Sequence, residues 1–217
     1  MIKNFDEFIN ENIFDGIGRR SKGGNVRKED EVKSVDLGLP SGTIWATCNL
    51  GAESPEECGD YYAWGETELK DKYSWNNYKF GTENNLTKYN KEDNKTILDP
   101  EDDAAHVVLG GKWHMPTKEQ IQELFDNTTN EESKFDGVKG RLFTSKINGN
   151  KLFFPYSGYK IDSSFGSSGY IGKYWSSSIN KSLHNYSITL YTKFNDCRLN
   201  HSNRCYGLCV RAVLNKK

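Results

Sequence analysis

Cysteine side chains are the first candidates for chemistry in this chain of 217 residues. Its five cysteines form no Cys-x-x-Cys pair, and no histidine stands at metal-ligand spacing from them. Cys205 and Cys209 lie four residues apart, which suggests a redox or copper site. On a strand this spacing separates two residues by about 13 Å, too far for a disulfide unless the chain turns at Gly207. Small buried or surface thiols are the favoured interpretation, with a disulfide framework or a zinc site as alternatives.

Acidic side chains between residues 93 and 103 offer the oxygen ligands that calcium prefers. Their spacing differs from that of a known calcium loop, so helix capping and solvation are favoured and calcium is the alternative. No residue stands in a nucleophile-elbow, HExxH or phosphate-loop pattern. The sequence therefore predicts no enzyme, no cofactor and no metal. The acidic residues are Asp93, Asp99, Glu101, Asp102 and Asp103.

Large rings dominate the apolar side chains. Hydrophobic types make up 35% of the residues and aromatic types 13%, and the mean hydropathy is −0.79. The rings and the net charge of −1 argue against a disordered chain, and the same charge disfavours non-specific binding to nucleic acid. Abundant glycine predicts many turns and excludes a helix bundle. No apolar run in the sequence is long enough to span a bilayer.

Residues 1–17 are predicted to form an amphipathic helix, because apolar side chains recur at intervals of three and four. The glycine-rich, charged stretch 18–34 predicts a flexible linker. A helix on a flexible tether suggests an anchor that docks on another protein; packing on its own domain is the alternative. Residues 1–17 also lack the features of a secretory signal. The predicted partner-binding residues are Ile2, Phe5, Phe8, Ile9, Ile13 and Ile17.

Residues 35–217 are predicted to form one domain of short strands, since apolar runs alternate with Gly, Asn, Asp and Ser clusters. Asn148-Gly149 lies between two such runs and predicts a hairpin. The stretch from Tyr73 to Asp99 is predicted to be a long polar loop. The predicted strands or parts of strands span residues 43–48, 61–64, 141–147, 151–156, 170–176, 186–194 and 208–214.

Two short helices are predicted in the same domain. Thr117 and Gln120 form a capping box, which starts a helix whose buried face carries Ile121, Leu124 and Phe125. A shorter helix is expected near residues 102–103, where acidic side chains suit the helix dipole.

Distinctive motifs recur throughout this domain: Val35 to Gly42, Trp45 to Ala52, Gly59 to Glu66, Trp113 to Thr117, Gly158-Tyr159, Tyr174 to Ser178 and Tyr206 to Val213. They closely resemble those of the Fibrobacter succinogenes major paralogous domain, a family common in gut Bacteroidetes and their phages. The resemblance implies an α+β fold of the C-type-lectin-like kind, on the formylglycine-generating-enzyme branch: a mixed sheet, two short helices and long loops. In that fold Trp45, Trp64, Trp113 and Trp175 would form an aromatic core.

The enzymatic branch of that fold binds copper through a cysteine pair. Cys205 and Cys209 do not lie in its motif, so the resemblance does not imply the oxidase activity. The chain is also similar to the variable proteins of diversity-generating retroelements, which display mutable ligand-binding residues near the C-terminus.

Residues 180–206 are rich in Asn, Ser, Tyr, His and Cys. Adenine-specific mutagenesis of Asn and Ser codons can produce Tyr, His, Asp, Cys or Arg, which would account for this composition. Binding surfaces favour several of these residue types. Strand alternation places Ile188 and Thr189 on opposite faces, and only one face can display the ligand-binding residues. The predicted ligand-binding residues are Tyr186, Tyr191, Asn195, Asp196, Arg198, Asn200, His201, Asn203, Arg204 and Tyr206.

These features predict a non-enzymatic binding or adhesion domain on a virion, as a head fibre, capsid decoration or tail adhesin. The N-terminal helix would bind a capsid or tail protein, and the C-terminal loops a glycan or protein of the host surface or mucosa. The chain would be made in the host cytoplasm and released by lysis, and a homo-oligomer is expected. A copper-dependent oxidase of the formylglycine-generating type and a structural decoration domain without ligand are the alternatives.

Overall fold

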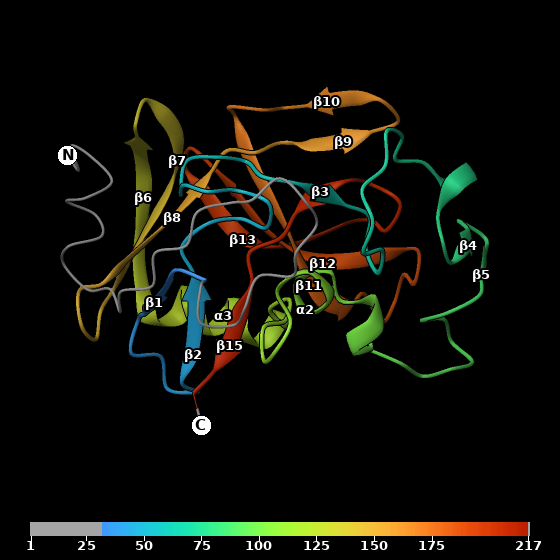
Figure 1. Cartoon of the computed structure of the whole chain (residues 1–217), viewed down its shortest axis with the longest axis horizontal. Coiled ribbons are helices and arrows are strands. Elements are labelled where there is room, and N and C mark those ends of the chain that lie inside the picture. The colour runs from blue at the N-terminus through green and yellow to red at the C-terminus, as the bar shows by residue number, and fades with distance from the viewer. Residues whose placement is uncertain (1–31, 217) are drawn as a thin grey trace.

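The computed structural model describes residues 32–216 and is mostly β (Figure 1). Strands account for 41% of the described residues and helices for 12%. Several small sheets stand in place of the one mixed sheet that was expected. Among the helices of residues 32–216, only α3 (Lys118–Asn127) is longer than two turns, because α2 (Ala104–Leu109) has six residues. The predicted α+β class is therefore wrong. The predicted anchor helix and most of the linker lie outside the described residues.

A five-stranded sheet has the order β13-β12-β11-β14-β3. Its β11, β12 and β13 pair antiparallel, whereas β14 runs parallel to β11 and antiparallel to β3. β13 is thus an edge strand. The bounds are Tyr61–Tyr62 (β3), Ile171–Ile179 (β11), Tyr186–Lys193 (β12), Asp196–Asn203 (β13) and Leu208–Cys209 (β14).

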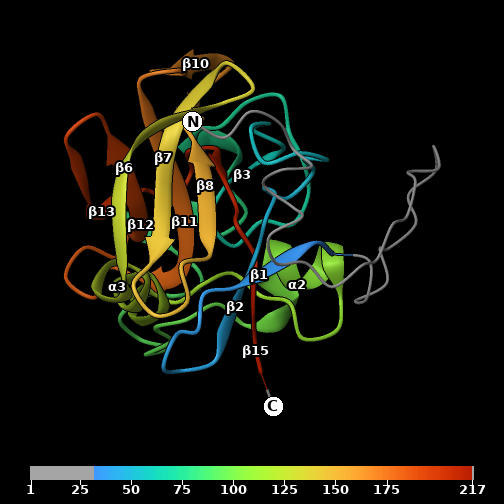
Figure 2. The ribbon, with the colours of Figure 1, turned by 90° about the vertical axis from the view of Figure 1, so that its left-hand side faces the viewer.

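A three-stranded antiparallel sheet, β6-β7-β8, lies against one face of the five-stranded sheet (Figure 2). The contact between the sheets is aromatic: the Phe154 ring of β8 meets the Tyr174 ring of β11 edge-on, with centroids 4.9 Å apart. The bounds are Thr128–Phe135 (β6), Val138–Ser145 (β7) and Lys151–Pro155 (β8).

The two ends of the described chain meet in the sheet β1-β2-β15, at the opposite end of the molecule from the hairpin β9–β10 (Figure 1). A small hairpin, β4–β5, and two 3-10 turns complete the fold. The bounds are Ser34–Asp36 (β1), Thr43–Ala46 (β2), Val213–Asn215 (β15), Tyr159–Ile161 (β9), Ser164–Gly166 (β10), Gly81–Thr82 (β4), Asn85–Leu86 (β5), Trp75–Asn77 (η2) and Pro100–Asp102 (η3).

Local sequence signals predicted several elements correctly. The Thr117 hydroxyl accepts from the Gln120 N–H, and the Gln120 side chain accepts from the Thr117 N–H, so the capping box starts α3 as expected. Asp103 caps α2 by accepting from the N–H groups of Ala105 and His106. The Asn148-Gly149 turn joins β7 to β8, which pair as the predicted hairpin.

None of the short strands β1, β4, β5, β9 and β10 was predicted from the sequence, and two polar strands of eight residues each were also missed. Every residue of β6 pairs with β7, although apolar and polar residues do not alternate along the sequence of β6. Its turn, Asp136-Gly137, has positive φ at both positions and is itself a hairpin signal. β13 likewise owes its structure to pairing along all of β12. Backbone hydrogen bonds to a neighbouring strand therefore decide these elements, not apolar alternation.

The core is aromatic, as the sequence predicted. Trp45, Trp64, Trp113 and Trp175 are all buried. The stretch predicted to be a polar loop, Tyr73 to Asp99, also supplies buried rings to this core, so its description as a polar excursion is wrong. Its buried rings are Tyr73, Tyr78, Phe80 and Tyr89. Among the described residues, no helix has the length and apolarity needed to cross a membrane.

Candidate binding surface

Three side chains form a row across the five-stranded sheet. Lys173 of β11 is the register partner of Tyr191 of β12, which in turn is opposite Arg198 of β13. Directly opposite residues on antiparallel strands share one face of the sheet, so the three side chains are neighbours. We call Lys173, Tyr191 and Arg198 the basic-aromatic row.

One contact within the row joins a cation to an aromatic ring. The Arg198 guanidinium lies 4.9 Å from the centroid of the Tyr191 ring and also pairs with Asp196. The Arg198 side chain keeps 53% of its surface exposed, so its remaining donors face solvent. Asn200, two residues along β13, lies on the same face.

Two tyrosines extend the row toward the hairpin β9–β10. The rings of Tyr159 and Tyr206 stack with centroids 6.3 Å apart, and the Lys173 ammonium lies 4.5 Å from the Tyr159 centroid. The same ammonium donates to the Ser202 hydroxyl at 3.4 Å. The site thus combines partly exposed rings, two cations and an amide, a composition typical of surfaces that bind glycans or proteins.

The Lys173 ammonium is expected to contact the ligand but to destabilise the fold. Burial lowers the pKa of its ammonium, which shows that its protein environment disfavours the charged form. Lys173→Met is therefore expected to leave the thermal midpoint unchanged or raise it, while ligand binding weakens. Thermal unfolding followed by circular dichroism checks the first part, and a lower midpoint would contradict it.

The remaining predicted residues do not join the row. Tyr186 and His201 lie on the opposite face of the hairpin and contact each other edge-on at 5.0 Å; Asn203 shares that face. Leu190, on the same face, is buried in the core. Asn195 lies exposed in the turn between β12 and β13. The predicted set is therefore split between two faces, and only Tyr191, Asp196, Arg198, Asn200 and Tyr206 are brought together.

Arg204 is a correction to the predicted set. It is fully buried, and its guanidinium donates to the Tyr78 hydroxyl and to the backbone carbonyls of Lys88, Tyr89 and His184. Its Cζ also lies 4.7 Å from the Trp64 ring. A side chain with these contacts supports the fold and cannot reach a ligand at the surface.

Sequence reasoning missed Lys173 and Tyr159. Alternation along residues 171–176 would have placed Lys173 on the face opposite to Tyr174. Tyr159 belongs to the Gly158-Tyr159 motif, which by itself indicates no role in binding. Neither signal reveals which face is open, because that depends on what packs on the sheet.

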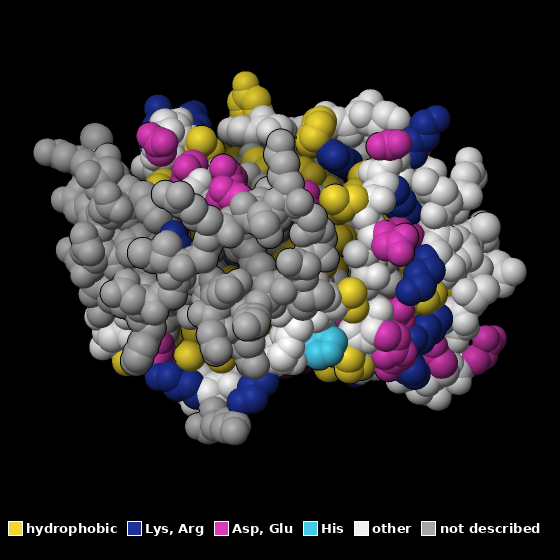
Figure 3. All heavy atoms as spheres, in the orientation of Figure 1, with side chains coloured by type: hydrophobic (Ala, Val, Ile, Leu, Met, Phe, Trp, Pro, Cys, Tyr) yellow, Lys and Arg dark blue, Asp and Glu magenta, His cyan; other side chains and the backbone are white. Residues whose placement is uncertain are grey.

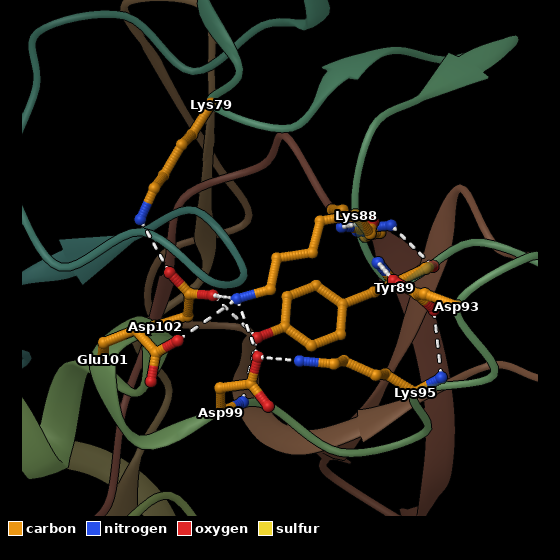
Figure 4. A network of polar contacts seen from close by, with 9 residues as sticks. Lys79, Lys88, Tyr89, Asp93, Lys95, Asp99, Glu101 and Asp102 are labelled. Atoms are coloured by element: carbon orange, nitrogen blue, oxygen red, sulfur yellow. Dashed lines mark hydrogen bonds and ion pairs between the residues drawn. The ribbon is translucent and has the colours of Figure 1, made fainter.

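The acidic cluster is occupied by a lysine (Figure 4). The Lys88 ammonium lies 2.7 Å from Asp99, 2.5 Å from Asp102 and 3.5 Å from Glu101. These are the carboxylates that lie close enough together to hold a metal ion in the described part of the chain. Since Lys88 already supplies the positive charge at their centre, the arrangement favours a structural ion-pair cluster over a calcium site.

Cys205 and Cys209 are both buried free thiols. All five cysteines are free thiols, and burial raises the pKa of both Cys205 and Cys209 to about 12. The Cys209 thiol donates to the Cys58 carbonyl at 3.0 Å. Metal binding requires a thiolate, which such burial disfavours. The interpretation as small buried thiols holds for this pair.

Comparisons of the chain with protein-family models, with curated proteins and with solved structures gave no match. The family resemblance of its motifs therefore stays a prediction.

Proposed function

We propose that this chain is a non-enzymatic binding domain that recognises a glycan or protein of a host surface through the basic-aromatic row. The observation that carries the proposal is the alignment of Lys173, Tyr191 and Arg198 across three adjacent strands, with Tyr159 and Tyr206 beside them. Tyr rings offer contact area at low entropic cost, and arginine adds directed hydrogen bonds.

The similarity of the motifs to those of retroelement-variable proteins supports this proposal. In such proteins the mutable positions serve ligand binding, and four of the residues predicted from this similarity lie on one face: Tyr191, Asp196, Arg198 and Asn200. The edge position of β13 leaves one of its sides without a neighbouring strand. Variation there disturbs the core less than variation in a central strand.

Arg198→Ala tests the row. In the full chain, binding to a mucin-coated surface and to a glycan array is expected to fall about tenfold or more, because hydrogen bonds to a charged group contribute about 1.5–3 kcal/mol. The matched control is His201→Ala, which removes a similarly placed side chain from the opposite face of β13. Unchanged binding by the Arg198 variant, or equal losses in both variants, would refute the proposal for this face.

We also propose that the domain is displayed on a virion and held there by residues 1–17. The proposal rests on the sequence pattern of those residues, which lie outside the described part of the chain. Deleting them is expected to abolish incorporation into particles while the domain keeps its circular dichroism spectrum and mucin binding. Incorporation at the wild-type level would rule out anchoring through this segment.

A further inference from the structure

A cleft of about 350 Å³ opens beside the hairpin β9–β10. Successive residues of a strand point to opposite faces, so Tyr159 extends the basic-aromatic row whereas its neighbour Lys160 lines the cleft. Figure 3 shows apolar and basic side chains side by side over this hairpin. The cleft is lined by Gly59, Asp60, Tyr61, Leu69, Lys70, Asp71, Tyr73, Lys160 and Phe165.

The Lys160 ammonium lies among three aromatic rings. Its distances to the ring centroids are 4.9 Å for Tyr61, 5.7 Å for Tyr73 and 4.8 Å for Phe165. Within residues 32–216 the ammonium has no hydrogen-bond acceptor and no ion-pair partner. Cation–π contacts orient this charge but do not satisfy its three N–H donors.

Two of the rings are held rigidly. The Tyr61 hydroxyl donates to the Ser157 carbonyl at 2.6 Å, and the Tyr73 hydroxyl donates to the Tyr61 carbonyl at 2.5 Å. The Tyr73 ring packs over Gly207, where a Cβ atom would lie 2.8 Å from it. Phe165 forms the outer wall, with 61% of its surface exposed and its ring 5.5 Å from that of Tyr61. The cleft is thus preorganised on its inner side and open at Phe165.

Among the charged residues that line the cleft, Lys160 is the cation that is available to pair with a ligand. Lys70 pairs with Glu66 at 2.7 Å, and Asp60 already has an interaction partner within the protein. Asp71 is exposed at the rim. A cationic ligand is disfavoured, since the place among the rings is taken by the protein's own ammonium. An anionic group would supply the acceptors that Lys160 lacks.

We propose that this cleft binds an acidic sugar, a saccharide unit that carries a carboxylate, as a site separate from the basic-aromatic row. The carboxylate pairs with Lys160, the apolar face of the sugar ring packs on Phe165, and Asp71 accepts from sugar hydroxyls. The volume is near the lower end of ligand pockets, about 300–1,000 Å³, which suits one or two sugar rings. This site does not depend on the function proposed for the row.

The test is titration of the full chain with methyl β-glucuronide and with N-acetylneuraminate, using methyl β-glucoside as the neutral control. Saturable binding of at least one acidic sugar is expected, with the glucoside about tenfold weaker or more, as for loss of a charged hydrogen bond. Lys160→Met keeps the packing of the side-chain stem and is expected to weaken binding of the acidic sugar by about the same factor. Phe165→Ala, at an exposed position, is expected to weaken it several-fold.

The matched control is Lys181→Met, the same change at an exposed lysine outside both the cleft and the basic-aromatic row, and this variant is expected to bind the acidic sugar as the wild type does. Since the two cleft variants change no residue of the row, the two proposals fail independently. Equal binding of the glucoside and the acidic sugars, unchanged binding by the folded Lys160 variant, or no saturable binding of either acidic sugar would each overturn the inference.

Discussion

Replacing Arg204 with alanine is expected to lower the free energy of unfolding by about 3–5 kcal/mol, a large part of the stability of a domain this size. The arginine is fully buried, and its donors satisfy the Tyr78 hydroxyl and three backbone carbonyls. The substitution leaves those acceptors without their partner and opens a cavity among the rings of Trp64, Tyr78 and Tyr89.

Urea unfolding followed by tryptophan fluorescence measures this loss. Arg204→Lys is expected to recover little, because a single ammonium cannot replace a planar guanidinium that donates in several directions. The matched control is Arg198→Ala: the same change six residues away, at a side chain that is 53% exposed, is expected to change stability by less than about 0.5 kcal/mol. Similar losses in the two alanine variants would contradict the assignment of Arg204 to the core.

Lys88→Met is expected to cost about 2–3 kcal/mol, because it removes the cation between Asp99, Glu101 and Asp102. The loss is smaller than for an isolated buried pair, since Asp102 keeps its ion pair with Lys79. Asp102 is almost completely buried, so its carboxylate cannot gain water in compensation. Adding Asp99→Asn to the lysine variant is expected to restore part of the stability by removing a like charge.

The same cluster predicts how stability depends on pH. Burial opposes ionisation of Asp102, but hydrogen bonds from Lys79 and Lys88 outweigh it and lower its pKa; hydrogen bonds from Lys88 and Lys95 lower that of Asp99. A lowered folded-state pKa stabilises the fold above the unfolded value, about 3.9 for Asp, and this stabilisation is lost as the pH falls through the folded-state value.

Wild-type protein is therefore expected to lose more stability than Lys88→Met between neutral pH and about pH 3. Urea unfolding at the two pH values measures the difference. Lys95→Met serves as the control, because that lysine is 42% exposed and its pair with Asp99 is an i,i+4 surface contact. The same acid dependence in wild type and Lys88→Met would show that the cluster is not coupled to folding.

Local sequence signals were sufficient to predict an element when all the residues that cause it lie in one short segment. The Thr117–Gln120 capping box needs only four residues, and the Asn148-Gly149 turn needs only the backbone freedom of its own positions. The buried tryptophans were predictable because the chain has few aliphatic side chains, and no other type of side chain in it buries as much apolar area. The fold class was not, since polar β6 and β13 become strands through pairing with neighbours.

The candidate site shows the same division. Sequence alone determined that residues 180–206 are rich in polar and aromatic side chains, and that alternate residues of a strand separate onto two faces. Only the tertiary structure decided which face is open, that Arg204 enters the core, and that Lys88 fills the acidic cluster. Each of these depends on side chains brought together from distant segments, such as Tyr78 beside Arg204 and Lys173 beside Tyr191, and the free energy of such contacts is not encoded in any one segment.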